Sequence, residues 1–154
     1  MKIRKANRKD AVKMNNLKKR TFQTINSKYY PKKLVEAYLK KQKSEKIIEN
    51  MKEKNYFVLE DKGGILGMAC LSKEGVLSSL YIRANQVNKG YGKKLLLFVE
   101  KYAKKKGLKE IKLYSTLNAI EFYKREGYKR TKKKDYWKLA GYKLPNHEMK
   151  KRLN

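Results

Sequence analysis

The chain of 154 residues is poor in cysteine, histidine and acidic residues. Its single cysteine, Cys70, excludes an intrachain disulfide framework. One cysteine and one histidine, His147, cannot supply the four ligands of an ordinary structural zinc site, so no metal site is expected. The same scarcity argues against catalysis by a Cys–His or Ser–His arrangement.

The sequence also has no long apolar stretch. No run approaches the roughly 20 apolar residues that a membrane-spanning helix needs. The first residues, Met1-Lys2-Ile3-Arg4, lead directly into mixed polar sequence without the apolar core of a signal peptide. We therefore expect a cytoplasmic protein with no membrane partner.

Positive charge dominates the composition, since 42 Lys and Arg stand against 14 Asp and Glu, a formal net charge of +28. A charge of this size attracts polyanions, nucleic acid among them. Most of the basic residues are lysines, whereas bidentate recognition of phosphate or guanine is typical of arginine. We interpret the charge mainly as a solvated surface and expect only non-specific contact with nucleic acid.

The length predicts one domain, residues 1–154, and the first third is predicted to be helical after a short strand at 2–6. Asn7 followed three residues later by Asp10 is typical of a capping box at a helix start. Apolar residues at helical spacing then predict helices over 11–25 and 31–39 and a third, short helix capped by Ser44.

The middle of the chain is predicted to be an antiparallel meander followed by a helical crossover. Alternating segments bounded by glycine turns predict strands over 56–60, 65–71 and 76–82. A long helix that ends at Gly107 leads to a strand over 110–114, which must lie parallel to the strand at 76–82 if both share a sheet.

The remainder is predicted to contain one short helix and two extended segments. The helix covers 119–126, and the extended segments begin at Tyr128 and after Gly141, the second as a strand or a tail. Together these elements predict a mixed α/β (α+β) fold without internal repeats or linkers.

A polar loop, Asn88 to Gly92, joins a predicted strand to the long helix. Its two glycines let the backbone turn tightly and leave the first helical N–H groups free, an arrangement that binds a phosphate or diphosphate. Lys89, Lys93 and Lys94 could add charge, although a plain helix-entry turn is the alternative. The glycine spacing of a P-loop or a Rossmann site is absent.

Two segments together resemble the GCN5-related N-acetyltransferase (GNAT) family. Leu80-Tyr81-Ile82, followed after a gap by Val87-Asn88-Lys89-Gly90-Tyr91-Gly92-Lys93, is similar to the family's strand, diphosphate loop and helix. Tyr114-Ser115-Thr116-Leu117-Asn118-Ala119-Ile120-Glu121-Phe122-Tyr123 with Gly127-Tyr128 is similar to its Ser-x-x-Ala-x-x-Phe-Tyr and Gly-Phe signature. The sequence departs from the family at Val87, where Gln or Arg is usual, and at Ala84, where Pro is common.

The resemblance implies a single-domain GNAT-like fold, with a mixed central sheet of about seven strands splayed at the cofactor site and four to five helices. It implies an enzyme that transfers the acetyl group of acetyl-CoA to a primary amine of a small molecule or peptide by direct attack. Tyr123 matches the tyrosine that protonates the departing thiolate. The cofactor-binding residues that it implies are Leu80, Tyr81, Ile82, Val87, Asn88, Lys89, Gly90, Tyr91, Gly92, Lys93, Ser115 and Asn118.

Several roles stay open at this stage. Ser115 and Asn118 could cap the following helix instead of binding the cofactor, and we prefer capping for both. The general base could be Glu74, His147 or a water chain. The acceptor is not identified, though the positive surface favours one with a carboxylate or phosphate, and Tyr29, Tyr30 and Tyr38 either shape its pocket or simply pack. A homodimer is left open, and the alternative function is a non-catalytic basic binding module.

Overall fold

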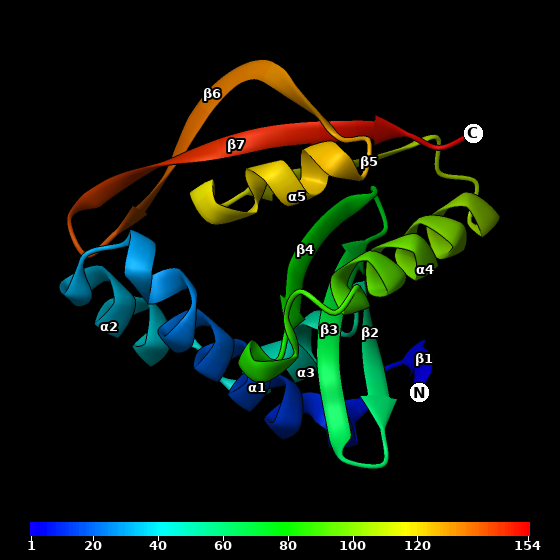
Figure 1. Cartoon of the computed structure of the whole chain (residues 1–154), viewed down its shortest axis with the longest axis horizontal. Coiled ribbons are helices and arrows are strands. Elements are labelled where there is room, and N and C mark those ends of the chain that lie inside the picture. The colour runs from blue at the N-terminus through cyan, green and yellow to red at the C-terminus, as the bar shows by residue number, and fades with distance from the viewer.

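A seven-stranded sheet with the order β1-β2-β3-β4-β5-β7-β6 forms the centre of the computed structural model, which describes residues 1–154 (Figure 1). The strands are β1 (Lys2–Lys5), β2 (Lys54–Asp61), β3 (Gly64–Ser72), β4 (Val76–Ile82), β5 (Glu110–Ser115), β6 (Lys129–Leu139) and β7 (Tyr142–Arg152). The helices are α1 (Ala11–Thr24), α2 (Lys32–Lys41), α3 (Ser44–Asn50), α4 (Tyr91–Lys105) and α5 (Ile120–Arg125). The predicted mixed fold, with about seven strands and four to five helices, is confirmed.

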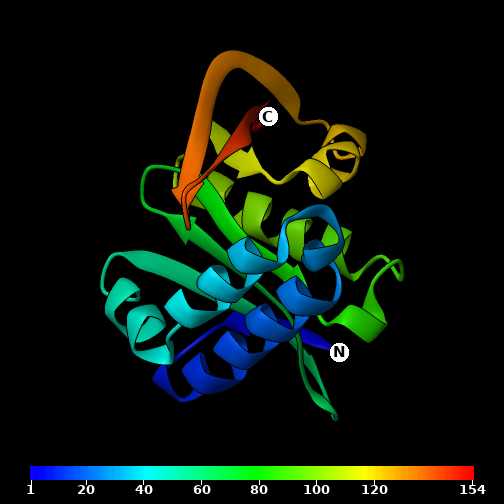
Figure 2. The same ribbon diagram turned by 90° about the vertical axis from the view of Figure 1, so that its left-hand side faces the viewer.

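The sheet is covered by helices on both faces, and β2 and β3 lie between the two helical layers (Figures 1 and 2). Successive residues of β2 alternate between two cores. Phe57 packs with Leu95 and Leu96 of α4, whereas Tyr56 and Val58 pack in the core of α1 and α3. Because a strand buried on both faces needs apolar residues at nearly every position, these strands read as apolar runs in the sequence.

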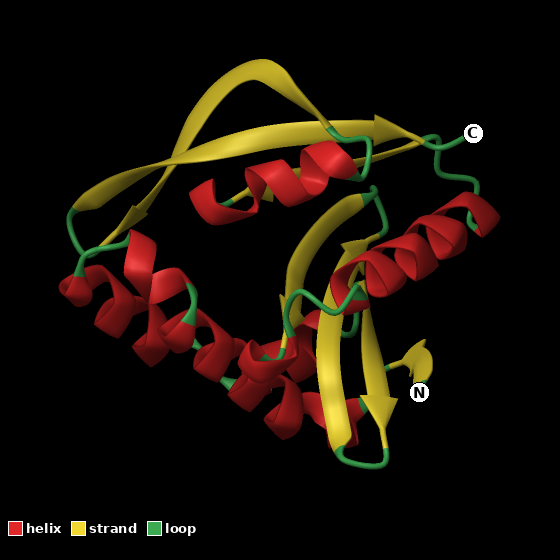
Figure 3. Ribbon diagram, in the orientation of Figure 1, coloured by secondary structure: helices red, strands yellow, loops and turns green.

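The predicted connections of the sheet are confirmed. The strands β2, β3 and β4 form an antiparallel meander, and β4 pairs with β5 in parallel after the α4 crossover. The extended C-terminal segments are the two strands of a long antiparallel hairpin, β6 and β7, of which β7 also pairs with β5 (Figure 3).

Only some of the predicted helix starts are confirmed. The Asn7 side chain accepts a hydrogen bond from Lys9 N at 2.9 Å and Asp10 closes the predicted capping box, which precedes one turn of 3-10 helix before α1. The prediction for Ser44 is wrong: it is the first residue of α3, Lys43 takes the N-cap position, and no side chain caps this helix. The predicted helix over 119–126 begins as a separate 3-10 turn, Leu117–Ala119, before α5.

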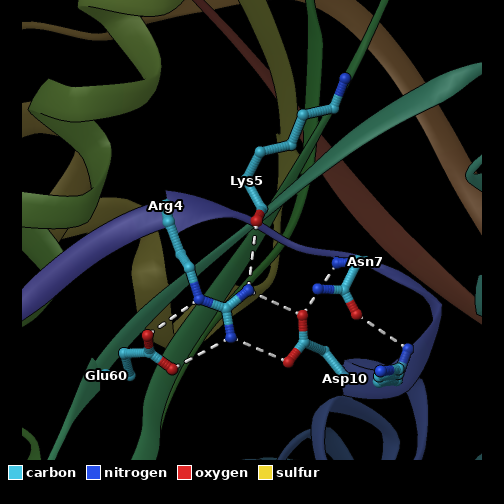
Figure 4. Close-up of polar contacts among 6 residues, drawn as sticks. Arg4, Lys5, Asn7, Asp10 and Glu60 are labelled. Atoms are coloured by element: carbon cyan, nitrogen blue, oxygen red, sulfur yellow. Dashed lines mark hydrogen bonds and ion pairs between the residues drawn. The ribbon is translucent and has the colours of Figure 1, made fainter.

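Arg4 of β1 ties the N-terminal strand to its neighbours (Figure 4). Its guanidinium donates to both carboxylate oxygens of Asp10 at 2.9 Å and to those of Glu60 on β2 at 2.8 and 3.0 Å. The Asp10 carboxylate also accepts a hydrogen bond from the backbone N–H of Asn7 at 2.8 Å. The hydrogen bonds from Arg4 are the main reason that the pKa of Asp10 lies below its usual value.

We expect Asp10→Asn to lower the free energy of unfolding at pH 7 by about 1–3 kcal/mol, because it removes an acceptor of charge-assisted hydrogen bonds. A carboxylate whose folded pKa is lowered stabilises the fold above its unfolded pKa, and this contribution is lost as the pH falls through the folded value. The difference between wild type and variant in urea titrations should therefore shrink below about pH 4.

The matched control is Glu110→Gln, which changes the net charge equally. Glu110 and Lys150 form an exposed ion pair at 3.6 Å, a kind of pair typically worth about 0–1 kcal/mol. If Asp10→Asn lowers the free energy of unfolding no more than Glu110→Gln does, or if its effect does not depend on pH, the stabilising role of this network is contradicted.

None of the helices has both the length and the hydropathy that a membrane span requires.

Candidate active site

The strands β4 and β5 separate in the middle of the sheet. They pair only at Val76 with Lys112 and at Leu77 with Leu113, although both strands continue beyond these pairs. From Ser78 onward the β4 edge that faces β5 therefore has no strand partner, and a sheet edge of this kind leaves backbone N–H and C=O groups free. The splay that the resemblance implied is confirmed.

A β-bulge lies in β4 at the start of this opening. Met68 of β3 pairs with Tyr81 and Cys70 pairs with Ser78, so Ser79 and Leu80 stand opposite a single residue. Ser79 has a φ of 55°, a value uncommon for a residue other than glycine. Bulges leave one residue outside the ladder and bend the strand, and this one turns β4 where its free edge begins.

A cleft of about 800 Å³ extends from this opening along β4 to the start of α4. Eleven of the thirteen site residues implied by the resemblance line it, and Lys89 and Tyr91 do not. Those in the lining are Leu80, Tyr81, Ile82, Val87, Asn88, Gly90, Gly92, Lys93, Ser115, Asn118 and Tyr123. The sequence reasoning missed Thr21 and Asn26 of the N-terminal helical region, Gln86 of the loop and Arg125 of α5, which carry no motif of their own.

The wall formed by Leu80 to Ile82 is partly engaged by the protein itself. The Ile82 carbonyl accepts a hydrogen bond from the Thr21 hydroxyl at 2.9 Å. A carbonyl oxygen has two lone pairs, so this contact leaves one acceptor site at Ile82. The Thr21 contact also fixes α1 against the open part of β4.

The start of α4 is shaped to hold an anion. Gly90 is its N-cap with a φ of 81°, and no side chain caps the helix. The N–H groups of the first three helical residues, Tyr91 to Lys93, therefore have no acceptor within the helix. A Cβ atom at Gly90 would meet nothing within 4 Å, so the space above this turn is open.

Lys89 of the loop and Lys93 of α4 both contact neighbouring side chains. Lys89 Nζ donates to Gln86 Oε1 at 3.1 Å, and Lys93 Nζ lies 3.8 Å from a carboxylate oxygen of Glu126. Both lysine side chains reach solvent, so these pairs are weak and break readily when a stronger anion arrives.

Tyr123 on α5 is 8% exposed and contributes to the cleft lining. Its ring packs edge-to-face with Phe122 at 5.1 Å and Tyr128 at 5.7 Å, between ring centroids. Burial raises the pKa of Tyr123, with a smaller contribution from Tyr81, so its hydroxyl stays protonated at neutral pH. These ring contacts hold the Tyr123 side chain in place within the cleft lining.

The preferred capping role of Ser115 and Asn118 is wrong. The Ser115 hydroxyl donates to the Thr116 carbonyl at 2.8 Å, and the Asn118 amide oxygen accepts from Asn26 at 3.3 Å. The N-cap positions are taken by Thr116 and Ala119, neither with a side-chain hydrogen bond. Both predicted residues line the cleft instead.

A second cavity of about 430 Å³ meets the cleft at the opening. The two cavities share lining residues from both separated strands and from the end of β5: Leu77, Ser78, Ser79, Tyr81, Tyr114 and, just after β5, Thr116. We call the second cavity the aromatic chamber, because Phe22, Tyr30, Tyr38 and Trp137 line it. Tyr38 stacks on Phe22 with centroids 3.8 Å apart, and its hydroxyl is 2.9 Å from that of Tyr81. Tyr29 lies in the cleft rather than in this chamber.

The candidate bases lie apart from both cavities. Neither Glu74 nor His147 contributes to either lining. Glu74 is exposed in the turn before β4, and His147 on β7 is 3.0 Å from the Arg130 guanidinium, measured at its Nδ1 atom. The chamber lining contains no Asp, Glu or His. A water chain therefore stays our prediction for the route by which the amine proton leaves.

Comparisons with known proteins agree with this architecture. The family model described as an acetyltransferase (GNAT) domain matches residues 18–152. No curated protein sequence matches the chain significantly.

Solved structures share the fold over almost the whole chain. A GCN5-related N-acetyltransferase from Rhodopseudomonas palustris superimposes with a TM-score of 0.90 at 21% identity, covering 99% of this chain and 95% of that one. PaiA N-acetyltransferase from Thermoplasma acidophilum, solved with coenzyme A, gives 0.82 at 22% identity and 98% coverage of each chain. The Salmonella typhimurium protein yncA, solved with its cofactor acetyl-CoA, gives 0.74 at 16% identity, covering 100% of this chain and 94% of that one.

Proposed function

Because the chain belongs to the GNAT acetyltransferase family, we propose that it transfers the acetyl group of acetyl-CoA to a primary amine. The observation that carries this proposal is the separation of β4 from β5, since it joins a long cleft to a second chamber at a free strand edge. A cofactor in the cleft and an amine in the chamber would meet there, which is what direct transfer requires.

The cleft suits coenzyme A in shape and in chemistry. Unpaired helical N–H groups at Tyr91 to Lys93, the open space above Gly90 and the positive end of the α4 dipole suit a diphosphate. The free edge of β4 around Leu80 to Ile82 offers backbone donors and acceptors to the pantetheine amides. PaiA and yncA share the fold and were solved with coenzyme A and acetyl-CoA, respectively, which supports this assignment by analogy.

The residues at the opening have distinct tasks. Acetyl-CoA supplies an acetyl group activated as a thioester. A β4 amide that lacks a strand partner is available to the thioester carbonyl oxygen, where negative charge develops during attack, an effect typically worth about 3 kcal/mol. Tyr123 holds its proton in the cleft lining and gives it to the leaving sulfur.

The aromatic chamber is the proposed binding place for the acceptor amine. It is bounded by α1, α2 and the β6–β7 hairpin, so its walls come from segments distant in sequence. Its lining is mostly apolar, and the serines Ser78 and Ser79 lie where it meets the cleft. An amine of the size of an amino acid suits its volume.

The proposal is tested by thiol release from acetyl-CoA in the presence of a panel of primary amines. We expect thiol and N-acetylated amine to appear in equal amounts, and no thiol release above background when the amine is omitted. Release of thiol without any acetylated amine, or no reaction with any amine despite bound coenzyme A, would contradict an acetyltransferase and favour a non-catalytic module.

The pH dependence should follow the amine rather than the enzyme. Because the chamber lining contains no Asp, Glu or His, log kcat/KM for an acceptor amine without a carboxylate should rise with a slope of about one up to the amine pKa, about 10 for an alkylamine. An amine of lower pKa should reach its plateau at correspondingly lower pH. A plateau near pH 6–7 that is the same for both amines would instead indicate a titrating base on the protein.

A further inference from the structure

Lys18 of α1 is a cation inside the lining of the aromatic chamber. It is partly buried, and it takes part in none of the ion pairs of the protein. Its Nζ lies 5.8 Å from the centroid of the Tyr38 ring. The lysine therefore stands against an aromatic wall with no carboxylate of the protein beside it.

A partly buried ammonium without an anionic partner is costly, because the contact with the Tyr38 ring replaces only part of the hydration that burial removes. Burial lowers the pKa of Lys18, the Cys70 thiol opposes this shift, and the positive charges of Lys46 and Lys54 add to it. The only other charged residue of the chamber lining is a second lysine, Lys138 of β6. All the charge of the chamber lining is therefore positive, and most of its other residues are apolar.

Resting on the function proposed above, we propose that the aromatic chamber selects a small-molecule amine that carries a carboxylate, with Lys18 as the partner of that carboxylate. The amine end then lies toward Ser78 and Ser79 at the opening, and the apolar body of the acceptor packs on the rings of Phe22, Tyr38 and Trp137. Of the two lysines of the lining only Lys18 is partly buried, and its single ammonium matches the single charge of a carboxylate. A polyamine meets two lysines and no carboxylate, so the chamber disfavours it.

The chamber can be tested without acetyl transfer. Calorimetry compares 3-phenylpropanoate with its neutral counterpart, 3-phenylpropanamide, on the whole protein. We expect the carboxylate to bind at least about tenfold more tightly, since a charge-assisted hydrogen bond contributes about 1.5–3 kcal/mol. Lys18→Met should remove most of this preference, and Lys18→Arg should keep part of it, which separates a lost charge from a misfolded chain.

The matched control is Lys13→Met, which removes an exposed lysine from the same helix and lowers the net charge equally. This variant should keep the full preference for 3-phenylpropanoate over 3-phenylpropanamide. Equal binding of the two probes to the wild type, or a preference that Lys18→Met leaves unchanged, would overturn the proposal.

Turnover separates this proposal from the function on which it rests. With acetyl-CoA present, we expect L-phenylalanine or 4-(aminomethyl)benzoate to be acetylated at least about tenfold more efficiently than 2-phenylethylamine or benzylamine, respectively. If each carboxylate-bearing amine is acetylated no better than its counterpart without a carboxylate, the proposed acceptor class is wrong, but the acetyltransferase activity is supported. A carboxylate preference in binding without acetylation of any amine supports the role of Lys18 and counts against the acetyltransferase.

Discussion

Gly90→Glu should abolish coenzyme A binding, and this is the largest effect that we expect from a single substitution. The new side chain enters the open space above the α4 N-terminus and places a carboxylate where the diphosphate would lie. It repels a ligand of the same charge, and it competes with that ligand for the free N–H groups at Tyr91 to Lys93. Calorimetry at near-physiological ionic strength should detect binding to the wild type and none to the variant.

The chain offers a closely matched control at the other end of the same helix. Gly107 has a φ of 82° and, like Gly90, open space where a Cβ atom would lie. Gly107→Glu therefore introduces the same charge and a similar backbone strain, about 1–2 kcal/mol, but lies at the C-terminal end of α4. It should bind coenzyme A as the wild type does. Unchanged affinity in Gly90→Glu would refute the assignment of the loop.

Tyr123→Phe should lower kcat by about 10²-fold or more, the size typical of a lost general acid. The phenyl ring keeps the contacts with Phe122 and Tyr128, so the packing of α5 is preserved. Only the hydroxyl proton is removed, and the affinity for coenzyme A should change little. Steady-state kinetics measures kcat, and calorimetry measures the affinity for coenzyme A.

Tyr102→Phe is the control for the loss of a phenol. Tyr102 lies on α4, packs against Phe57 with ring centroids 4.9 Å apart, and lines neither cavity. Its variant should keep full turnover. Wild-type kcat in Tyr123→Phe would remove the acid role, and a parallel loss of coenzyme A affinity would show that Tyr123 acts in binding instead.

The sequence predicts the fold well where apolar periodicity is local. The meander β2–β4 and the helix α4 follow from alternation and helical spacing, because each buries a face that a short window of sequence reveals. Helix starts are predicted less well. Asn7 caps as expected because its own turn supplies the donor, whereas Ser44 follows an extended Lys43 that already occupies the N-cap position.

More of the cleft than of the chamber could be predicted from the sequence. Most of the cleft lies in two motif segments, so resemblance alone finds Gly90 and Tyr123. The chamber brings Lys18 and Trp137 together across more than a hundred residues, through the placement of α1 and the β6–β7 hairpin. Neither residue belongs to a motif, and one lysine among 42 basic residues carries no local signal. The capping prediction for Asn118 fails for a related reason, since a tertiary contact with a distant residue decides between a cap and a cavity wall.

The most direct test of the central claim is a crystal structure of the protein with acetyl-CoA and, as acceptor mimic, 3-phenylpropanoate. The account predicts the diphosphate on the amides of Tyr91 to Lys93 and the thioester at the opening between β4 and β5, within reach of the Tyr123 hydroxyl. It predicts the carboxylate of the mimic beside Lys18. A cofactor bound elsewhere, or a thioester that does not reach the junction of cleft and chamber, would contradict it.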